Sequence, residues 1–174
     1  MTINKELSRL AIFPFVIILV GILSVGSIVS TTSIQVLAQE DSSQDNKELV
    51  QTFTNDLYVD RNSTAIDKYL ADNYVGHLTN GNSIDKESVK GNISAFINAF
   101  PDLIGNTEQI IAEGDLVAIF SKWNGTFTGQ DLFDATANNN PVTIAVADLF
   151  RIADGQIVES WQVGDYSNFT KAIH

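Results

Sequence analysis

The chain has 174 residues, no cysteine and a formal net charge of −11. The absence of cysteine excludes disulfides, thiol chemistry and cysteine-ligated metals, and the negative charge argues against nucleic acid and anionic lipid as partners. The length that remains after an N-terminal hydrophobic segment is that of one ordinary domain with its own core.

Residues 1–38 are typical of an export signal. Lys5 and Arg9 precede an apolar run from Leu10 to Val29, and Val36-Leu37-Ala38 offers the small and β-branched residues that a signal peptidase reads. The run is also about 20 residues long, which is enough for an uncleaved membrane anchor. In both cases the positive residues before it predict that the remainder lies outside the cytoplasm, either secreted or anchored by this segment.

Residues 39–46 are predicted to be a polar linker, and residues 47–174 the domain. Helical spacing of apolar residues predicts a helix at Lys47–Tyr58, a short one after Asn62 and a third between Ser83 and Pro101. Strands are predicted after Pro101 at Leu103–Ala112, Leu116–Thr126, Pro141–Ile152 and Gln156–Gly164. Helices followed by an antiparallel sheet indicate an α+β fold, with the helices on one face of a curved sheet.

One acid lies on the buried face of a predicted strand. Every second residue of this strand points to the same side, and these residues are Val142, Ile144, Val146, Asp148, Phe150 and Ile152. Since the other five are large and apolar, Asp148 is buried, and burial raises the pKa of a carboxyl towards the range of a general acid or base. The alternatives are that Asp148 pairs with a buried tyrosine, arginine or backbone donor, or that a bulge turns it outward.

The other candidates are less specific. His77 titrates in the working range of an enzyme, but a single histidine is often a packed or surface residue. Trp123 and Trp161 lie on strand faces, either as core filling or as walls of a ligand pocket. Asp165 has the same strand parity as Ile157 and Trp161. We find no metal-ligand spacing, nucleophile triad, phosphate loop or dinucleotide fingerprint.

Short motifs with a consistent order and spacing run through nearly all of the predicted domain. They are Tyr74-Val-Gly-His77, Ala99-Phe-Pro-Asp-Leu103, Ala112-Glu-Gly-Asp-Leu-Val117, Trp123-Asn-Gly-Thr126, and Asp148-Leu-Phe-Arg-Ile-Ala-Asp-Gly-Gln-Ile-Val-Glu-Ser-Trp161 followed by Asp165. Together these motifs resemble the SnoaL-like polyketide cyclase (ester cyclase) family of the NTF2-like superfamily. The sequence departs from the family at Ser160, where a histidine often precedes the tryptophan of the last strand.

The resemblance implies a cone-shaped α+β barrel, in which a bent sheet wraps a long helix and leaves a pocket for a small molecule. It also implies ring closure by intramolecular aldol condensation, with no metal or cofactor. Asp148 would be the acid/base on the penultimate strand, and His77 a second catalytic group. The substrate would contact Tyr74, Trp123, Trp161 and Asp165.

Three functions therefore stand side by side. The first is an exported, cofactor-independent cyclase or isomerase that acts on a small hydrophobic carbonyl or ester compound. The second is a non-catalytic domain that binds small molecules outside the membrane. The third is an interaction module that forms a homodimer through the open face of its sheet. Asp148→Asn separates the first from the second, because only the first requires an ionisable group at this position.

Overall fold

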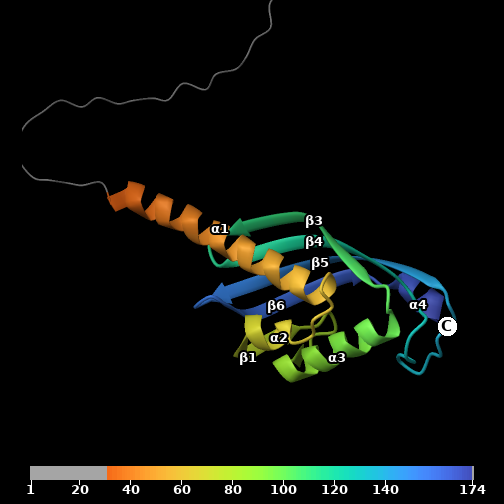
Figure 1. Cartoon of the computed structure of the whole chain (residues 1–174). Coiled ribbons are helices and arrows are strands. Elements are labelled where there is room, and N and C mark those ends of the chain that lie inside the picture. The colour runs from red at the N-terminus through yellow and green to blue at the C-terminus, as the bar shows by residue number, and fades with distance from the viewer. Residues whose placement is uncertain (1–30, 174) are drawn as a thin grey trace, which may run out of the picture. The chain divides into compact units, whose positions relative to one another are not determined.

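A six-stranded sheet with helices packed against it forms the domain (Figure 1). The structure is a computed structural model that describes residues 31–173, so most of the predicted export signal lies outside the described residues. The helices are α1 (Thr31–Tyr58), α2 (Ala65–Tyr69), α3 (Lys86–Ala99) and α4 (Ser167–Ile173). The strands are β1 (Leu70–His77), β2 (Ser83–Ile84), β3 (Ile104–Glu113), β4 (Leu116–Thr126), β5 (Pro141–Ala153) and β6 (Gln156–Asp165). Within residues 31–173, no helix is long and apolar enough to cross a membrane.

The strand order is β2-β1-β6-β5-β4-β3, and every neighbouring pair is antiparallel except β1 and β6. The predicted α+β class with a curved, mostly antiparallel sheet is confirmed. The sheet is open rather than closed, with β2 and β3 at its two edges. Strand β1 follows the short helix α2 and pairs in parallel with β6. The first strand of the domain therefore lies beside its last strand.

The inner face of the sheet packs against the helices in two hydrophobic clusters. In one, Val50, Phe53 and Leu57 of α1 pack on residues of β4, β5 and β6. In the other, Ile97 and Phe100, at the end of α3, pack on β4, β5 and α4. The alternation predicted for β4 and β5 is observed, since their inward residues are buried: Val117, Ile119, Ser121, Trp123, Val142, Ile144, Val146, Asp148, Phe150 and Ile152.

Helix α1 is longer than the sequence pattern predicts. It begins at Thr31 rather than Lys47, so the segment 39–46, expected to be a linker, is helical. Its polar residues do not oppose a helix, and two of them bind the turn between β3 and β4. Asn46 Nδ2 donates to the Gly114 carbonyl over 2.9 Å, and Ser43 Oγ accepts from the Gly114 N–H over 3.2 Å. Tertiary contact with this turn therefore supports a stretch that lacks an apolar face of its own.

Strand β6 contains a β-bulge. Ile157 pairs with Ile152 and Glu159 pairs with Arg151, so two steps along β6 match one step along β5 and Val158 is the extra residue. A bulge of this kind reverses which side chains face which side of the sheet. Ile157 faces inward, but beyond the bulge it is Ser160 and Gln162 that do so. The predicted single register of Ile157, Trp161 and Asp165 is therefore wrong.

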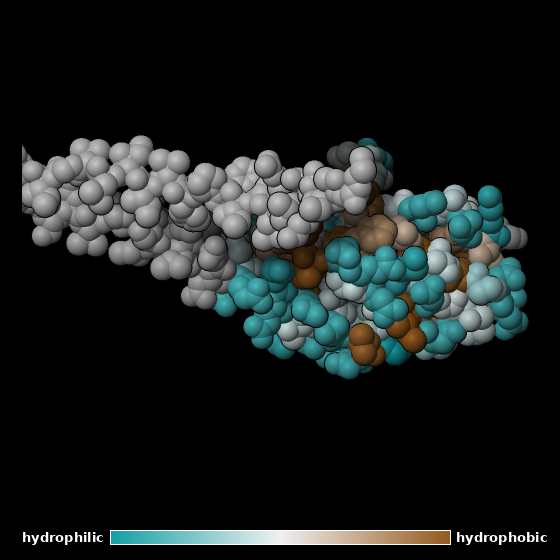
Figure 2. Space-filling model, turned by 90° about the horizontal axis from the view of Figure 1, so that it is seen from above, coloured by the Kyte–Doolittle hydropathy of each residue, from teal (hydrophilic) through white to brown (hydrophobic). Residues whose placement is uncertain are grey.

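The visible surface of the domain is mostly hydrophilic (Figure 2). Figure 2 shows hydrophilic residues over much of the visible face of the domain, with separate hydrophobic residues between them. Single exposed hydrophobic side chains of this kind are normal on protein surfaces.

Two glycines, one in α3 and one packed against its C-terminal end, provide a matched test of packing at this helix. A Cβ atom on Gly129 would lie 1.9 Å from the Asn98 carbonyl oxygen, whereas one on Gly91 would meet nothing within 4 Å. Gly129→Ala should therefore lower the free energy of unfolding by about 1–3 kcal/mol or more, because backbone atoms must shift. Gly91→Ala, in the interior of α3, should raise it by roughly 0.5–1 kcal/mol. Urea denaturation measures both, and equal effects of the two substitutions would contradict this packing.

Candidate active site

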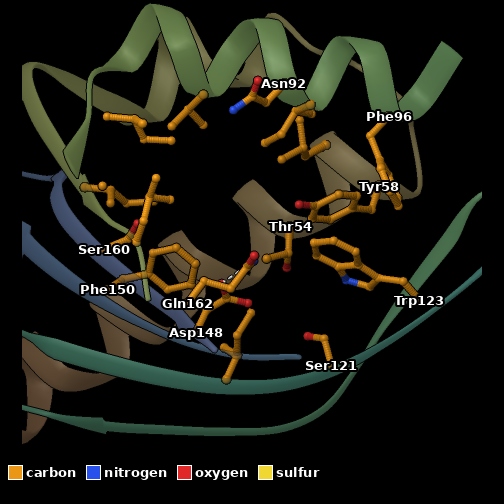
Figure 3. A pocket seen from close by; sticks show the side chains of 18 of the residues that line it. Thr54, Tyr58, Asn92, Phe96, Ser121, Trp123, Asp148, Phe150, Ser160 and Gln162 are labelled. Atoms are coloured by element: carbon orange, nitrogen blue, oxygen red, sulfur yellow. Dashed lines mark hydrogen bonds between the residues drawn. The ribbon is translucent and has the colours of Figure 1, made fainter. Parts of the chain in front are cut away.

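A cavity of about 460 Å³ lies between the inner face of the sheet and helices α1 and α3 (Figure 3). This volume is within the range of small-molecule sites. Most of the lining is apolar, with Phe53, Leu57, Ile93, Phe96, Ile119, Phe150, Ile157 and Phe169 among its members. Leu78, Phe133 and Tyr166 also border the cavity and are 40%, 66% and 38% exposed, so the lining reaches the protein surface at these residues.

Asp148 points into this cavity from the middle of β5. The residue is only 8% exposed, and its Oδ1 atom accepts a hydrogen bond of 2.7 Å from Gln162 Nε2. Burial raises the pKa of Asp148 from 3.8 to about 6, and the bond from Gln162 opposes this rise. The described lining contains no lysine or arginine. The predicted inward acid is thus present, and its partner is an amide rather than a tyrosine, arginine or backbone donor.

Gln162 connects Asp148 to the edge of the cavity. It lies directly opposite Asp148 in the β5–β6 ladder, on the inward parity that the bulge creates. Its Oε1 atom accepts a hydrogen bond of 2.6 Å from the hydroxyl of Tyr166. Burial and the nearby charge of Asp148 raise the pKa of Tyr166 to about 12, so this hydroxyl remains protonated at neutral pH.

Tyr74 and Ser160 form a second polar pair in the wall. The Tyr74 hydroxyl and Ser160 Oγ are hydrogen-bonded at 2.5 Å, and burial raises the pKa of Tyr74. Ser160 occupies the position where the resembled family often has histidine, and the bulge turns this position towards the cavity. Gly76 lies beside the pair, and a Cβ there would approach the Tyr74 hydroxyl to 2.8 Å. This side of the cavity therefore offers the hydroxyl groups of Tyr74 and Ser160.

Aromatic rings form the wall between α1 and β4. The Tyr58 and Trp123 rings lie 4.7 Å apart at 38°, and the Phe96 ring lies 6.0 Å from Trp123. Burial, followed by the charge of Asp148, raises the pKa of Tyr58 well above its ordinary value. Among the described residues, no hydrogen-bond partner contacts the Tyr58 hydroxyl. Trp123 is therefore in the cavity, as expected, and Tyr58 adds a donor that remains available to a ligand.

His77 and Trp161 place their rings on the outer face of the sheet. They pair across β1 and β6 and stack at 4.7 Å with an angle of 8°. His77 Nε2 is 2.8 Å from Glu159 Oε1, and Glu159 Oε2 accepts from Arg151 Nε over 2.9 Å. His77 borders the cavity, but its imidazole is held in this outer cluster, and Trp161 is not among the lining residues. The expected place of Trp161 at the cavity is therefore wrong, whereas His77 borders the cavity as expected and its catalytic role stays a prediction.

Asp165 also lies on the outer parity of β6 and is absent from the lining. Its Oδ1 atom accepts from Ser167 N over 3.0 Å and from Ser167 Oγ over 2.6 Å, and these bonds lower its pKa. Asp165 thus ends β6 and begins α4. Asp148 and His77 both border the cavity and Asp165 does not, so the expected place of Asp165 at the pocket is corrected.

The bulge explains two of the four site residues that the sequence analysis missed. Gln162, Ser160, Tyr166 and Tyr58 belong to the cavity, but straightforward parity counting assigned the first two to the outer face. The sequence contains one sign of this reversal. Glu159 has the same strand parity as Trp161, and an unpaired acid on a buried face is unfavourable. An acid at that position is better explained by a change of parity before it. Within residues 31–173, no group of three or more potential ligands could hold a metal ion.

Comparison with known proteins now defines the class. The family model of SnoaL-like polyketide cyclases matches residues 48–173, and the chain belongs to this family. No curated protein sequence matches the chain.

Solved structures share the fold at low sequence identity. A candidate SnoaL-like polyketide cyclase from Jannaschia sp. CCS1 has a TM-score of 0.68 and 19% identity, over 75% of this chain and 92% of that one. AclR, a candidate hydroxylase from Streptomyces galilaeus, has a TM-score of 0.68 and 20% identity, over 73% and 79%. An LEH-like epoxide hydrolase from M. tuberculosis has a TM-score of 0.59 and 16% identity, over 76% and 91%. These neighbours carry different chemistries, so the fold does not choose between reactions.

The raised pKa of Asp148 predicts a pH-dependent cost in stability. The folded state resists ionisation, so the wild-type protein loses stability as pH rises from about 4 through about 6. Asp148→Asn removes this loss, and the variant should gain about 3 kcal/mol relative to wild type between pH 4 and pH 8. Urea denaturation at the two pH values measures the change. A difference between the proteins that is the same at both pH values would show that Asp148 is not buried as a neutral acid.

Proposed function

We propose that this domain binds a small hydrophobic carbonyl or ester compound and catalyses its cyclisation or isomerisation with Asp148 as the acid/base. The observation that carries the proposal is a buried carboxyl group, with a pKa raised to about 6, at the wall of an apolar cavity. A carboxylate of this kind is a stronger base than an ordinary aspartate and still ionises near neutral pH.

The lining supports a ligand without negative charge. No lysine or arginine of the described lining could pair with a carboxylate or phosphate on a ligand. Such a group would also be repelled by ionised Asp148 in a medium that screens charge poorly. The aromatic and aliphatic side chains of the lining instead favour a hydrophobic ligand that contains a compact ring system or that folds into one during the reaction.

The chemistry follows from the groups that face the cavity. Asp148 would accept the proton from a carbon next to a carbonyl group, which leaves an enolate. The enolate carbon would attack a second carbonyl of the same molecule, and the proton on Asp148 would pass to the resulting alkoxide. Tyr58 is placed to donate a hydrogen bond to a developing oxyanion, because its high pKa keeps the hydroxyl protonated. Proton and charge balance over the cycle, and the aspartate is regenerated.

A second candidate function is binding without turnover. It is favoured by the outward imidazole of His77 and by Ser160 in place of a histidine, because among the described lining residues Asp148 is then the one carboxyl group in the cavity and no imidazole points towards it. A bound ligand that remains unchanged after long incubation would support this function.

We place the domain outside the cytoplasm, either secreted or anchored through its N-terminal segment. The basic residues and apolar run of residues 1–38 support this location. The test is a reporter that is active only outside the cytoplasm, fused after the domain. If the location is correct, the fusion protein should show reporter activity.

The outer face of the sheet supports a homodimer. Ile111, Phe120 and Val163 lie on it and are 68%, 41% and 57% exposed. If two copies meet through this face, Phe120→Glu should reduce the dimer to a monomer, because the charge would have to be buried. Light scattering measures the mass in solution. A wild-type monomer at high concentration would exclude this association.

The enzymatic proposal predicts a large and specific effect of one substitution. Asp148→Asn should lower turnover by about 10²–10⁴-fold, because the general base is lost. The probe is a panel of aryl-substituted diketones able to close to a six-membered ring, with the cyclic β-hydroxy ketone product measured by chromatography. For wild type, kcat/KM should rise with pH through about 6, since the ionised form is the base.

The matched control is Asp60→Asn, which changes an exposed aspartate that is not among the cavity-lining residues. It should retain wild-type turnover. If Asp148→Asn retains turnover as well, the mechanism is wrong and binding without catalysis is favoured.

A further inference from the structure

A chain of hydrogen bonds runs from the open side of the cavity to the buried acid. The Tyr166 hydroxyl donates to Gln162 Oε1 over 2.6 Å, and Gln162 Nε2 donates to Asp148 Oδ1 over 2.7 Å. Asp148 Oδ2 has no hydrogen-bond partner among the described residues. One oxygen of the carboxyl group is therefore held, and the other is left for a ligand.

The direction of the amide is determined at both ends. An amide side chain has one donor end and one acceptor end, and an ionised carboxylate only accepts. The NH₂ group of Gln162 must then face ionised Asp148, and the carbonyl must face Tyr166. Tyr166 satisfies that carbonyl as a donor because its own hydroxyl stays protonated.

Helix α4 holds Tyr166 in place. The Tyr166 carbonyl accepts from Thr170 N over 2.9 Å and from Thr170 Oγ1 over 3.0 Å. Phe169 and Ile173 of the same helix are buried in the second core cluster. The position of the tyrosine is thus coupled to packed residues rather than to a free loop.

We propose that Gln162 and Tyr166 are positioning residues that hold Asp148 Oδ1 and present Oδ2 to the substrate. Gln162 acts on the carboxylate directly, and Tyr166 acts through Gln162 by keeping the donor end of the amide towards Asp148. Their part in proton transfer rests on the proposed function, whereas the hydrogen-bond chain can be tested without any substrate.

The surroundings of Asp148 make the effect of this chain measurable. The titratable groups that face it are Tyr58 from α1, Tyr74 from β1 and Tyr166 before α4, and all three are neutral at pH 7. The His77 imidazole is turned to the outer cluster with Glu159 and Arg151. Gln162 is thus the one group that lowers the pKa of Asp148 against burial.

The test is a pH titration of the Asp148 side-chain carboxyl by carbon-13 NMR, with the signal assigned through Asp148→Asn. Gln162→Leu should shift the titration upward so that the ionisation constant falls about tenfold, since a donor to the charged form is lost. Tyr166→Phe should shift it in the same direction by a smaller amount. Tyr74→Phe is the matched control, because it removes a cavity hydroxyl that bonds Ser160 instead of Gln162, and it should leave the titration unchanged.

Two results would overturn the proposal. One is an unchanged titration in Gln162→Leu, and the other is a Tyr166→Phe curve that coincides with that of Tyr74→Phe. Gln162→Met, which keeps an unbranched chain of similar length, provides the same comparison if the leucine variant does not fold. These outcomes do not depend on turnover, so loss of the hydrogen-bond chain is distinguishable from loss of the enzymatic function.

If the wild-type protein catalyses the reaction, the same variants can also be compared by their kinetics. Gln162→Leu should move the rising limb of the pH–rate profile to higher pH and lower kcat more than it raises KM, because the misplaced group acts on the chemical step. A rise in KM alone would assign Gln162 to ligand binding and not to the positioning of Asp148.

Discussion

The bulge at Val158 is the constraint on which the site depends. Strand β6 pairs with β5 on one side and with β1 on the other, so its register must satisfy two neighbours at once. The extra residue lets Ile157 enter the core and still turns Ser160 and Gln162 inward further along. Without this reversal, Trp161 and Asp165 would face the cavity, and Asp148 would have no amide partner.

A second constraint is the burial of a carboxyl group with no cation beside it. Isolated charge in a poorly polar site is costly, so the group responds by binding its proton more tightly. The fold tolerates this because Asp148 is neutral at low pH and receives a strong hydrogen bond from Gln162 when ionised. The burial that weakens the folded state near neutral pH also raises the pKa of Asp148 to about 6 and so gives the cavity a base of moderate strength. Stability and chemistry are thus linked through one residue.

The outer face of the sheet has a different character. His77, Glu159, Arg151 and Trp161 form a connected cluster that joins β1, β5 and β6. Arg151 also binds Asp115 at the turn that ends β3, over 2.7 Å. These residues satisfy one another by charge and stacking, which explains why the rings of a histidine and a tryptophan from a family-like motif are held at the outer face. The cluster secures the parallel β1–β6 pairing, on which the position of Tyr74 in the cavity wall depends.

The sequence by itself determined the α+β class, the buried alternation of β4 and β5, and the inward positions of Asp148 and Trp123, because regular strands obey a period of two. Tyr74 also came from the sequence, through its place in a family-like motif. Only the tertiary structure decided the faces of Ser160, Trp161, Gln162 and Asp165, since one unpaired residue shifts every later side chain by a half period. It also decided that residues 39–46 are helical and that Tyr58 and Tyr166 reach the cavity. These features depend on contacts between segments that are distant in the chain, and the local spacing of residues does not predict such contacts.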